Sequence, residues 1–219
     1  AAQRPHGAVG EDGSRNVIDA VNYLTSRVWA DAEGRDALGA VVVMDQQIVT
    51  ARSIQKADAR PGGYVTTGGH GGVLGTISSI GRPVVSMVPT HRQTWKSAVR
   101  MTAPLDPERM PLVGFVKIGQ YMEMADDVDA SRQVGILTRV AQVVQSGELA
   151  GFVGEGSAPF GTLSSSAEAA LRLAVFSGLP VVKVGRGGGG VSERTYAPFA
   201  IAGGNLSAPK ARLLLMAAL

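Results

Sequence analysis

The second half of the chain alternates between short apolar runs and amphipathic segments, and this order restricts the fold more than any other feature. Runs typical of strands and segments with helical spacing follow one another at 112–117, 132–145, 150–153, 165–176 and 180–184. Gly178 supplies the expected stop after the second of these helices. Strands that alternate with helices predict a parallel sheet with right-handed crossovers. A short extended piece at 197–202 and a final helix at 208–219, with Ser207 at its cap, complete the pattern.

The first half gives a less regular α/β pattern. Residues 16–29 have helical apolar spacing, with Ser14 or Asp12 as candidate cap. The run AVVVM at 40–44 is typical of a strand buried on both faces, and it can form a hairpin with 48–50. A further strand fits 83–87. The apolar positions of the predicted helix are Val17, Ile18, Val21, Leu24 and Val28.

The segment from Val88 to Pro111 separates these two patterns. It carries four prolines and scattered charges, which is typical of a connection between domains. We therefore expect an α/β domain at 1–88, a linker at 89–111 and a second α/β domain at 112–219.

The composition excludes several classes of protein. The 219 residues are 45% hydrophobic, their net charge is only +3, and no basic run is interleaved with aromatic residues, so we expect no nucleic-acid partner. No apolar run approaches the length of a membrane span, so we expect a soluble protein that does not use a membrane as partner, with a cytoplasmic location favoured over a periplasmic or secreted one. Cysteine is absent, which excludes disulfides and thiolate metal sites.

Two glycine-rich segments imitate functional motifs. TTGGHGG at 66–72 is interpreted as a loop that shapes a site, with His70 as a loop histidine and Thr67 as the less favoured nucleophile. GRGGGG at 185–190 satisfies a dinucleotide-binding pattern, but no amphipathic helix follows to receive the phosphate. With three histidines and no ligand-spaced carboxylates near them, we expect neither a metal nor another cofactor.

Four segments, taken in order, resemble the bacterial L-asparaginase/glutaminase family. They are AAQRPHGAVGEDGSRNVIDAV, GAVVVMDQQIVTARSIQK, LPVVKVGRGGGGV and GGNLSAPKARLLLMAAL, and together they span nearly the whole chain. The resemblance implies an amidohydrolase that releases ammonia from a side-chain amide through an acyl-threonine intermediate. It covers the latter two-thirds of such a protein.

The resemblance gives Lys56 a role. It stands where the family keeps a lysine that works with a threonine and an aspartate. A threonine hydroxyl is a poor nucleophile until a base takes its proton, and a lysine serves as that base only when burial or neighbours make it neutral part of the time. The other interpretation of Lys56 is a surface charge that ends a strand.

The family's nucleophile is missing from these residues. Neither Thr-Gly-Gly-Thr nor His-Gly-Thr-Asp-Thr occurs in the 219 residues, and the family places both ahead of the segment that matches Ala2-Gln3-Arg4-Pro5. We therefore expect the nucleophile to come from an N-terminal segment or a separate chain.

The resemblance also implies a site shared between subunits of a homodimer or homotetramer. In the loop at 154–163, where the family has an asparagine, Ser157 or Thr162 stands in its place, and Glu193 lies near the family's acidic substrate contact. The same loop could be an ordinary strand-to-helix connection. The alternatives left open are a non-catalytic or split subunit on the same fold, and an amidase for glutamine, another small amide or a peptide amide.

Overall fold

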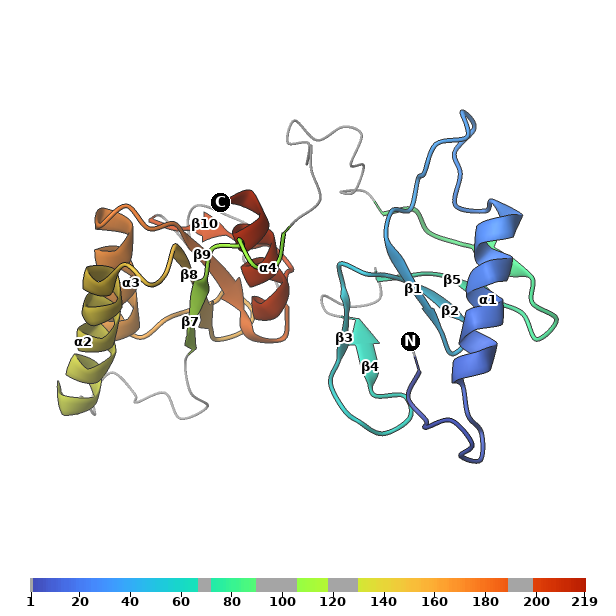
Figure 1. Ribbon diagram of the computed structural model, residues 1–219, viewed down its shortest axis with the longest axis horizontal. Helices are drawn as coiled ribbons and strands as arrows, with labels where there is room; N and C mark the ends of the chain where they lie inside the picture. Colours follow the sequence, from blue (N-terminus) through green and yellow to red (C-terminus); the bar gives the residue numbers. More distant parts are fainter. Residues whose placement is uncertain (1, 67–71, 90–105, 118–129, 189–198) are drawn as a thin grey trace. The chain divides into compact units, whose positions relative to one another are not determined.

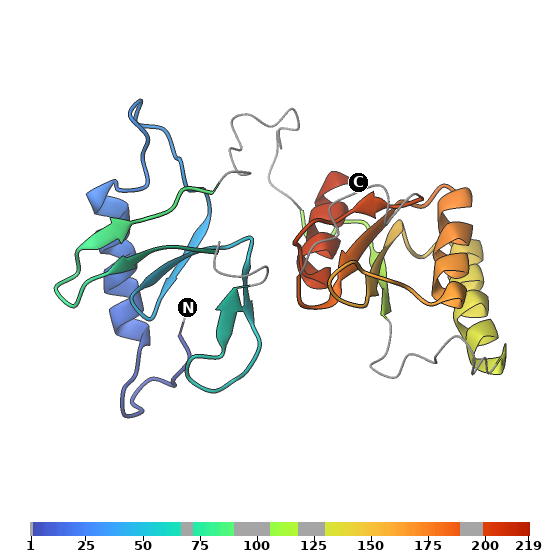
Figure 2. The same cartoon turned by 180° about the vertical axis from the view of Figure 1, so that it is seen from behind.

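The chain forms two compact units, Ala1–Thr102 and Ala103–Leu219. The computed structural model describes residues 2–66, 72–89, 106–117, 130–188 and 199–219, and Figures 1 and 2 show them from two sides.

The first unit is built on a four-stranded antiparallel sheet. Its order is β1-β2-β5-β6, formed by Val41–Met44, Gln47–Thr50, Val73–Ile77 and Pro83–Val85. A turn at Asp45 and Gln46, both with positive φ, joins the first two strands into the expected hairpin. A separate two-stranded ladder consists of β3 (Ile54–Lys56) and β4 (Tyr64–Thr66). The sequence pattern did not predict β3, β4 or β5; β3 and β4 have three residues each, too few to show a periodic pattern.

Alternating side chains bury both faces of this sheet. Helix α1 (Gly13–Ser26) packs on one face, where Tyr23 meets Val43 and Ile48 in one apolar cluster. The other face carries Met44 and Val49, which cluster with Ile54 of β3. Strand β1 is therefore buried on both sides over its second half, as its continuous apolar sequence predicts.

The second unit is a three-layer parallel structure. Its sheet has the order β10-β9-β8-β7, with all neighbours parallel. Helices α2 and α3 cover one face and α4 covers the other, as Figures 1 and 2 show. The elements are β7 (Val113–Lys117), α2 (Ala130–Ser146), β8 (Gly151–Gly156), α3 (Ser165–Phe176), β9 (Val181–Gly185), β10 (Ile201–Ala202) and α4 (Ala208–Ala218).

The α/β class and the parallel sheet of the second half are thus confirmed, and the helix at 165–176 has the predicted bounds. Ser164 caps it by accepting a hydrogen bond from the backbone N–H of Ala167 at 3.3 Å. Ser207 occupies the cap position of α4, but its side chain makes no capping hydrogen bond. Within the described ranges, no helix is long and apolar enough to cross a membrane.

Candidate functional site

Lys56 is held at the end of a short hairpin. It closes β3 and lies opposite Tyr64 of β4, while Ile54 lies opposite Thr66. Residues two apart on a strand, and residues directly opposite on its partner, share one face of a ladder. The side chains of Ile54, Lys56, Tyr64 and Thr66 therefore lie on the same face.

This face borders a cavity of about 440 Å³ in the first unit. The apolar residues that line it include Met44, Val49 and Ile54, and the polar ones include Gln3, Asp45, Gln47, Tyr64 and Thr66. Lys56 is exposed and does not line the cavity itself, but its Nζ lies 5.9 Å from the ring centroid of Tyr64, a wall residue. Within the described part of the chain, Lys56 has no ion-pair partner.

The connection from Lys56 to Tyr64 is a tight loop with a fixed backbone. The N–H groups of Ala57 and Asp58 both donate to the Gly63 carbonyl, at 2.8 and 3.0 Å. Gly62 has a φ of +79°, which favours glycine, and a Cβ on Gly63 would collide with the Asp58 carbonyl. The loop thus fixes the end of the hairpin on which Lys56 stands.

A residue of the N-terminal Gln-Arg-Pro motif forms hydrogen bonds to this loop. The Gln3 side chain accepts from the backbone N–H of Gly62 at 2.7 Å and donates to the Arg60 carbonyl at 3.2 Å. The backbone N–H groups of Gln3 and Arg4 donate in turn to the Asp12 carboxylate. The Gln-Arg-Pro … Asp-Gly sequence therefore builds a scaffold for the Lys56 hairpin.

The electrostatics of Asp12 follow from these bonds. The N–H of Arg4 first, then the N–H of Gln3 and the side chain of Asn16, lower the pKa of Asp12 below its ordinary value of 3.8, while partial burial acts in the opposite direction. Asp12 occupies the cap position of α1, but its carboxylate serves the preceding segment instead of the helix N–H groups.

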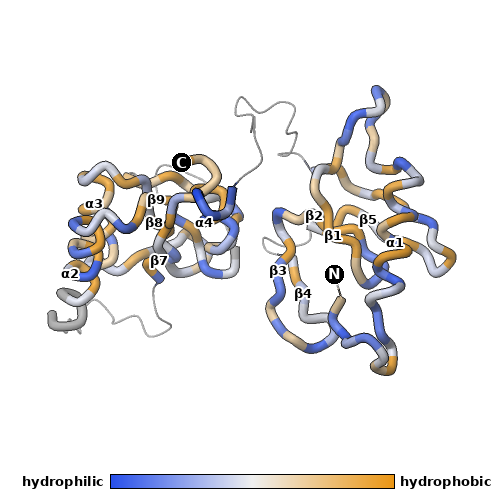
Figure 3. Tube along the Cα trace, in the orientation of Figure 1, coloured by the Kyte–Doolittle hydropathy of each residue, from blue (hydrophilic) through white to orange (hydrophobic). Residues whose placement is uncertain are grey.

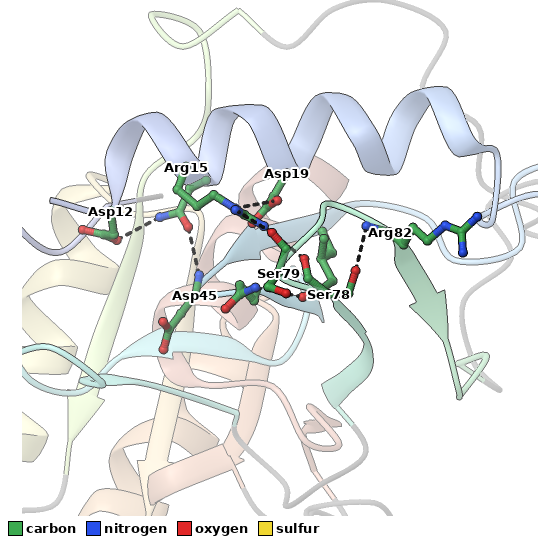
Figure 4. Close-up of polar contacts among 10 residues, drawn as sticks. Asp12, Arg15, Asp19, Asp45, Ser78, Ser79 and Arg82 are labelled. Carbon is green, nitrogen blue, oxygen red and sulfur yellow. Dashed lines mark hydrogen bonds and ion pairs between the residues drawn. The ribbon is translucent and has the colours of Figure 1, made fainter. Parts of the chain in front are cut away.

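Asn16 links this scaffold to the sheet. Its Nδ2 donates to Asp12 at 2.8 Å, and its Oδ1 accepts from the backbone N–H of Asp45 at 2.9 Å (Figure 4). Asn16 is buried, and it fixes the β1–β2 turn at the rim of the cavity. Sequence reasoning did not single out Asn16, Asp45 or Tyr64. Their contacts join segments that are far apart in the chain, and a single sequence does not show which distant segments meet.

In the second unit the structure brings Ser157 and Thr162 together. The Ser157 N–H donates to the Thr162 carbonyl at 2.9 Å, and the Gly161 N–H donates to the Ser157 carbonyl at 2.7 Å. The Ala158–Pro159 peptide is cis, and Gly161 has a φ of +67°. The contact is made by backbone atoms, and Thr162 is exposed in this loop at the carboxyl end of β8. In a parallel sheet this end is a favoured position for ligands.

Two lysines of the second unit lie near this end of the sheet. Lys117 pairs with Glu155 at 3.5 Å across the neighbouring ends of β7 and β8. Lys183 in β9 is only 6% exposed, and burial lowers its pKa although the charge of Glu168 acts in the opposite direction. Sequence reasoning did not single out either lysine, because the apolar run around Lys183 indicates only a buried strand.

Three residues discussed from the sequence lie outside the described residues: Glu193, Thr67 and His70. Lys56 belongs to the first unit, and Ser157 and Thr162 belong to the second. Among the residues that the structure does describe, no group of three His, Asp or Glu side chains could hold a metal ion.

The fold defines an α/β protein with an antiparallel sheet in the first unit and a parallel sheet in the second. Residues 1–98 match the family model described as "Asparaginase, N-terminal". The first 98 residues thus match the family that their motifs resemble.

A solved structure extends the likeness in fold to the whole chain. All of the chain superimposes on the probable cytoplasmic L-asparaginase from Campylobacter jejuni, with a TM-score of 0.70 and 24% sequence identity. The chain spans 64% of that protein's length. No curated protein sequence matches the chain.

Proposed function

We propose that this chain forms the latter part of an asparaginase-like amidohydrolase in which Lys56 assists a threonine nucleophile supplied by other polypeptide. The observation that carries the proposal is the position of Lys56. It ends β3 opposite Tyr64, a residue that lines the cavity, within the segment that matches the asparaginase family model. The Asn16–Asp45 contact and the Gln3–Gly62 contact hold the walls of the cavity around it.

The reaction would proceed through a covalent intermediate. The threonine oxygen attacks the carbon of the side-chain amide while its proton passes to the lysine amine. The C–N bond then breaks, the nitrogen leaves as ammonia after it takes up a proton, and an acyl-threonine ester remains. Water attacks that ester, releases the carboxylic acid and restores the threonine hydroxyl.

Residues of the second unit would bind the substrate in a neighbouring subunit. Thr162 is exposed on a closed loop at the carboxyl end of β8, and Ser157 anchors the other end of that loop. Glu193 would contact the substrate amino group. A homodimer or homotetramer with twofold symmetry would present each composite site twice. By analogy with the printed name of the Campylobacter jejuni protein, we place the enzyme in the cytoplasm.

The proposed substrate is an amide of the asparagine type. One observation supports a different amide as a second candidate. The loop at 154–163 contains no asparagine, and a backbone bridge between Ser157 and Thr162 closes it. A changed loop would change the group that recognises the substrate, so glutamine or another small amide is the second candidate.

A fusion protein tests the proposal. The part of the Campylobacter jejuni asparaginase that lies outside the match would be joined ahead of Ala1, since the sequence resemblance places the nucleophile there. We expect ammonia release from asparagine or glutamine by the fusion and none by the 219-residue chain alone. A fusion whose threonine nucleophile is changed to alanine is the control. Robust release by the chain alone would show that the chemistry lies elsewhere, and Thr67 would then be the first residue to replace. A folded fusion that is inactive on every small amide tested would favour a non-catalytic subunit.

A further inference from the structure

A groove of about 270 Å³ lies between strand β7 and helix α2 of the second unit, and we call it the α2–β7 groove. Helix α2 lines it with Ile136, Arg139, Val140 and Val143. Their spacing of i, i+3, i+4 and i+7 places these four residues on one side of the helix. Figure 3 shows the mixed hydropathy along α2. The groove belongs to the second unit, whereas the cavity beside Lys56 belongs to the first, so the two are different sites.

The walls of the α2–β7 groove are mostly apolar. Val140 is buried, and Ile136 and Val143 are partly buried against the same core cluster. On the strand side, Gly114 has no side chain, and a Cβ there would come within 2.5 Å of the Cδ1 of Leu149. In the described residues β7 pairs only with β8, so no further strand covers the groove beyond β7. An apolar ligand that displaces water from such walls gains free energy through the hydrophobic effect.

Arg139 is the charged residue on the α2 side of this groove. It is exposed, and among the described residues it has no ion pair or hydrogen bond. Lys117, the other cation that lines the groove, is paired with Glu155 at 3.5 Å. The groove thus contains one guanidinium without an ion-pair partner. A guanidinium matches a carboxylate through two parallel N–H···O hydrogen bonds, which are among the stronger hydrogen bonds in proteins.

We propose that the α2–β7 groove binds a small free carboxylic acid, whose carboxylate pairs with Arg139 while its apolar chain lies against Val140 and Val143. An apolar cavity of about 150 Å³ holds one benzene molecule, so the volume of this groove suits a chain of roughly eight carbons. A nucleotide or another drug-sized ligand needs more room. A groove of this size also does not supply the roughly 800 Å² per partner that a stable protein interface buries. The proposal uses neither Lys56 nor the amide chemistry.

Isothermal titration of the 219-residue chain with octanoate tests the proposal, with 1-octanol as the uncharged ligand of the same chain length. We expect saturable binding of octanoate. Arg139→Met should weaken it on the order of tenfold or more, because the charge-assisted hydrogen bonds are lost, and should change the binding of octanol by less than about twofold. Arg139→Lys keeps the charge without the planar guanidinium and should restore part of the affinity. Arg82→Met, which removes an exposed arginine of the first unit, is the control and should change nothing.

A second variant tests the apolar part of the groove. Val143→Phe fills the space without a change of charge and should abolish the binding of both octanoate and octanol. Val84→Phe makes the same change at an exposed valine of β6 and should leave both affinities unchanged. The thermal transition of each variant shows whether it is folded. Arg139→Met alters only an exposed side chain, so it keeps the test valid if Val143→Phe does not fold.

Three results would overturn the proposal. The first is no saturable binding of octanoate by the folded chain, which would leave Arg139 as a solvated surface charge. The second is equal octanoate affinity in the parent and in folded Arg139→Met or Val143→Phe, which would place the ligand elsewhere. The third is a dimer mass in light scattering that Val143→Phe abolishes and octanoate does not, which would assign the groove to a second copy of the chain. None of these measurements depends on ammonia release, so the proposed function stands or fails separately.

Discussion

The side-chain oxygen of Asn16 accepts a hydrogen bond of 2.9 Å from the backbone N–H of Asp45, and this contact ties helix α1 to the turn at the rim of the cavity. Because the Asn16 amide also donates to Asp12, one buried side chain joins the N-terminal motif to the sheet. The cavity beside Lys56 thus depends on residues that are distant from it in sequence.

Lys56→Met in the fusion should lower the rate of amide hydrolysis by on the order of 100- to 10,000-fold, the usual cost of losing a general base. The fold should be unchanged, because Lys56 is exposed and ends its strand. The measurement is kcat for ammonia release together with the thermal transition. Lys117→Met is a matched control, since Lys117 also ends a strand and lies 5.1 Å from the ring centroid of Phe115. Near-normal turnover in Lys56→Met would remove the assignment.

Thr162→Ala should raise KM by about tenfold in the fusion, because one hydrogen bond to the substrate is worth roughly 1–1.5 kcal/mol. Stability should not change, since the loop is closed by the Thr162 backbone. The exposed Thr76 on β5 gives the control Thr76→Ala, for which no change in KM is expected. An unchanged KM in Thr162→Ala would mean that this loop does not contact the substrate.

Arg15→Ala should destabilise the protein more than Asp19→Ala does. The first change leaves the fully buried Asp19 carboxylate without its partner, at a cost of about 2–3 kcal/mol after allowance for the exposed side of the pair. The second leaves Arg15, which is 41% exposed, to bond the carbonyls of Ser78 and Ser79 and water. Urea unfolding of both variants measures the difference.

The surface pair between Arg35 and Asp31 provides the comparison, because Arg35 is half exposed. Arg35→Ala should cost less than about 1 kcal/mol. If Arg15→Ala proved as mild as Arg35→Ala, the ion pair of Arg15 and Asp19 would not fix the orientation of α1.

The free energy of unfolding should fall in acid partly through Asp12. Its pKa in the folded protein is lowered below the ordinary value of 3.8, so its bonds contribute stability above that value and lose it as the pH falls through the folded pKa. Asp12→Asn should be less stable than the parent at pH 6, and the difference should shrink below pH 4. Urea unfolding from pH 2 to pH 6 measures it, with Asp106→Asn in the second unit as the control. A constant difference across this range would mean that the charge of Asp12 is not involved.

The parallel sheet of the second unit was determined by the sequence alone. Strands β8 and β9 each follow a helix, and right-handed crossovers leave few ways to arrange such a chain. The helix α3, its cap Ser164 and the stop at Gly178 follow from local chemistry, which one sequence shows directly. The family of the first 98 residues was also readable, because its motifs are contiguous.

The tertiary structure decided which side of α1 is buried, which the apolar spacing of the helix did not predict correctly. The spacing of Val17, Val21 and Leu24 predicts a helix, and α1 is one, but the same spacing would place these residues in the core. The buried side of α1 is instead determined by Asp19, Asn16 and their partners on segments tens of residues away. A charged side chain can be buried only where other groups form hydrogen bonds or an ion pair with it. The hairpin of Lys56 was hidden for a related reason. Strands of three residues show almost no periodic pattern. The loop that joins β3 and β4 is bonded by the side chain of Gln3, a residue 59 positions earlier in the sequence.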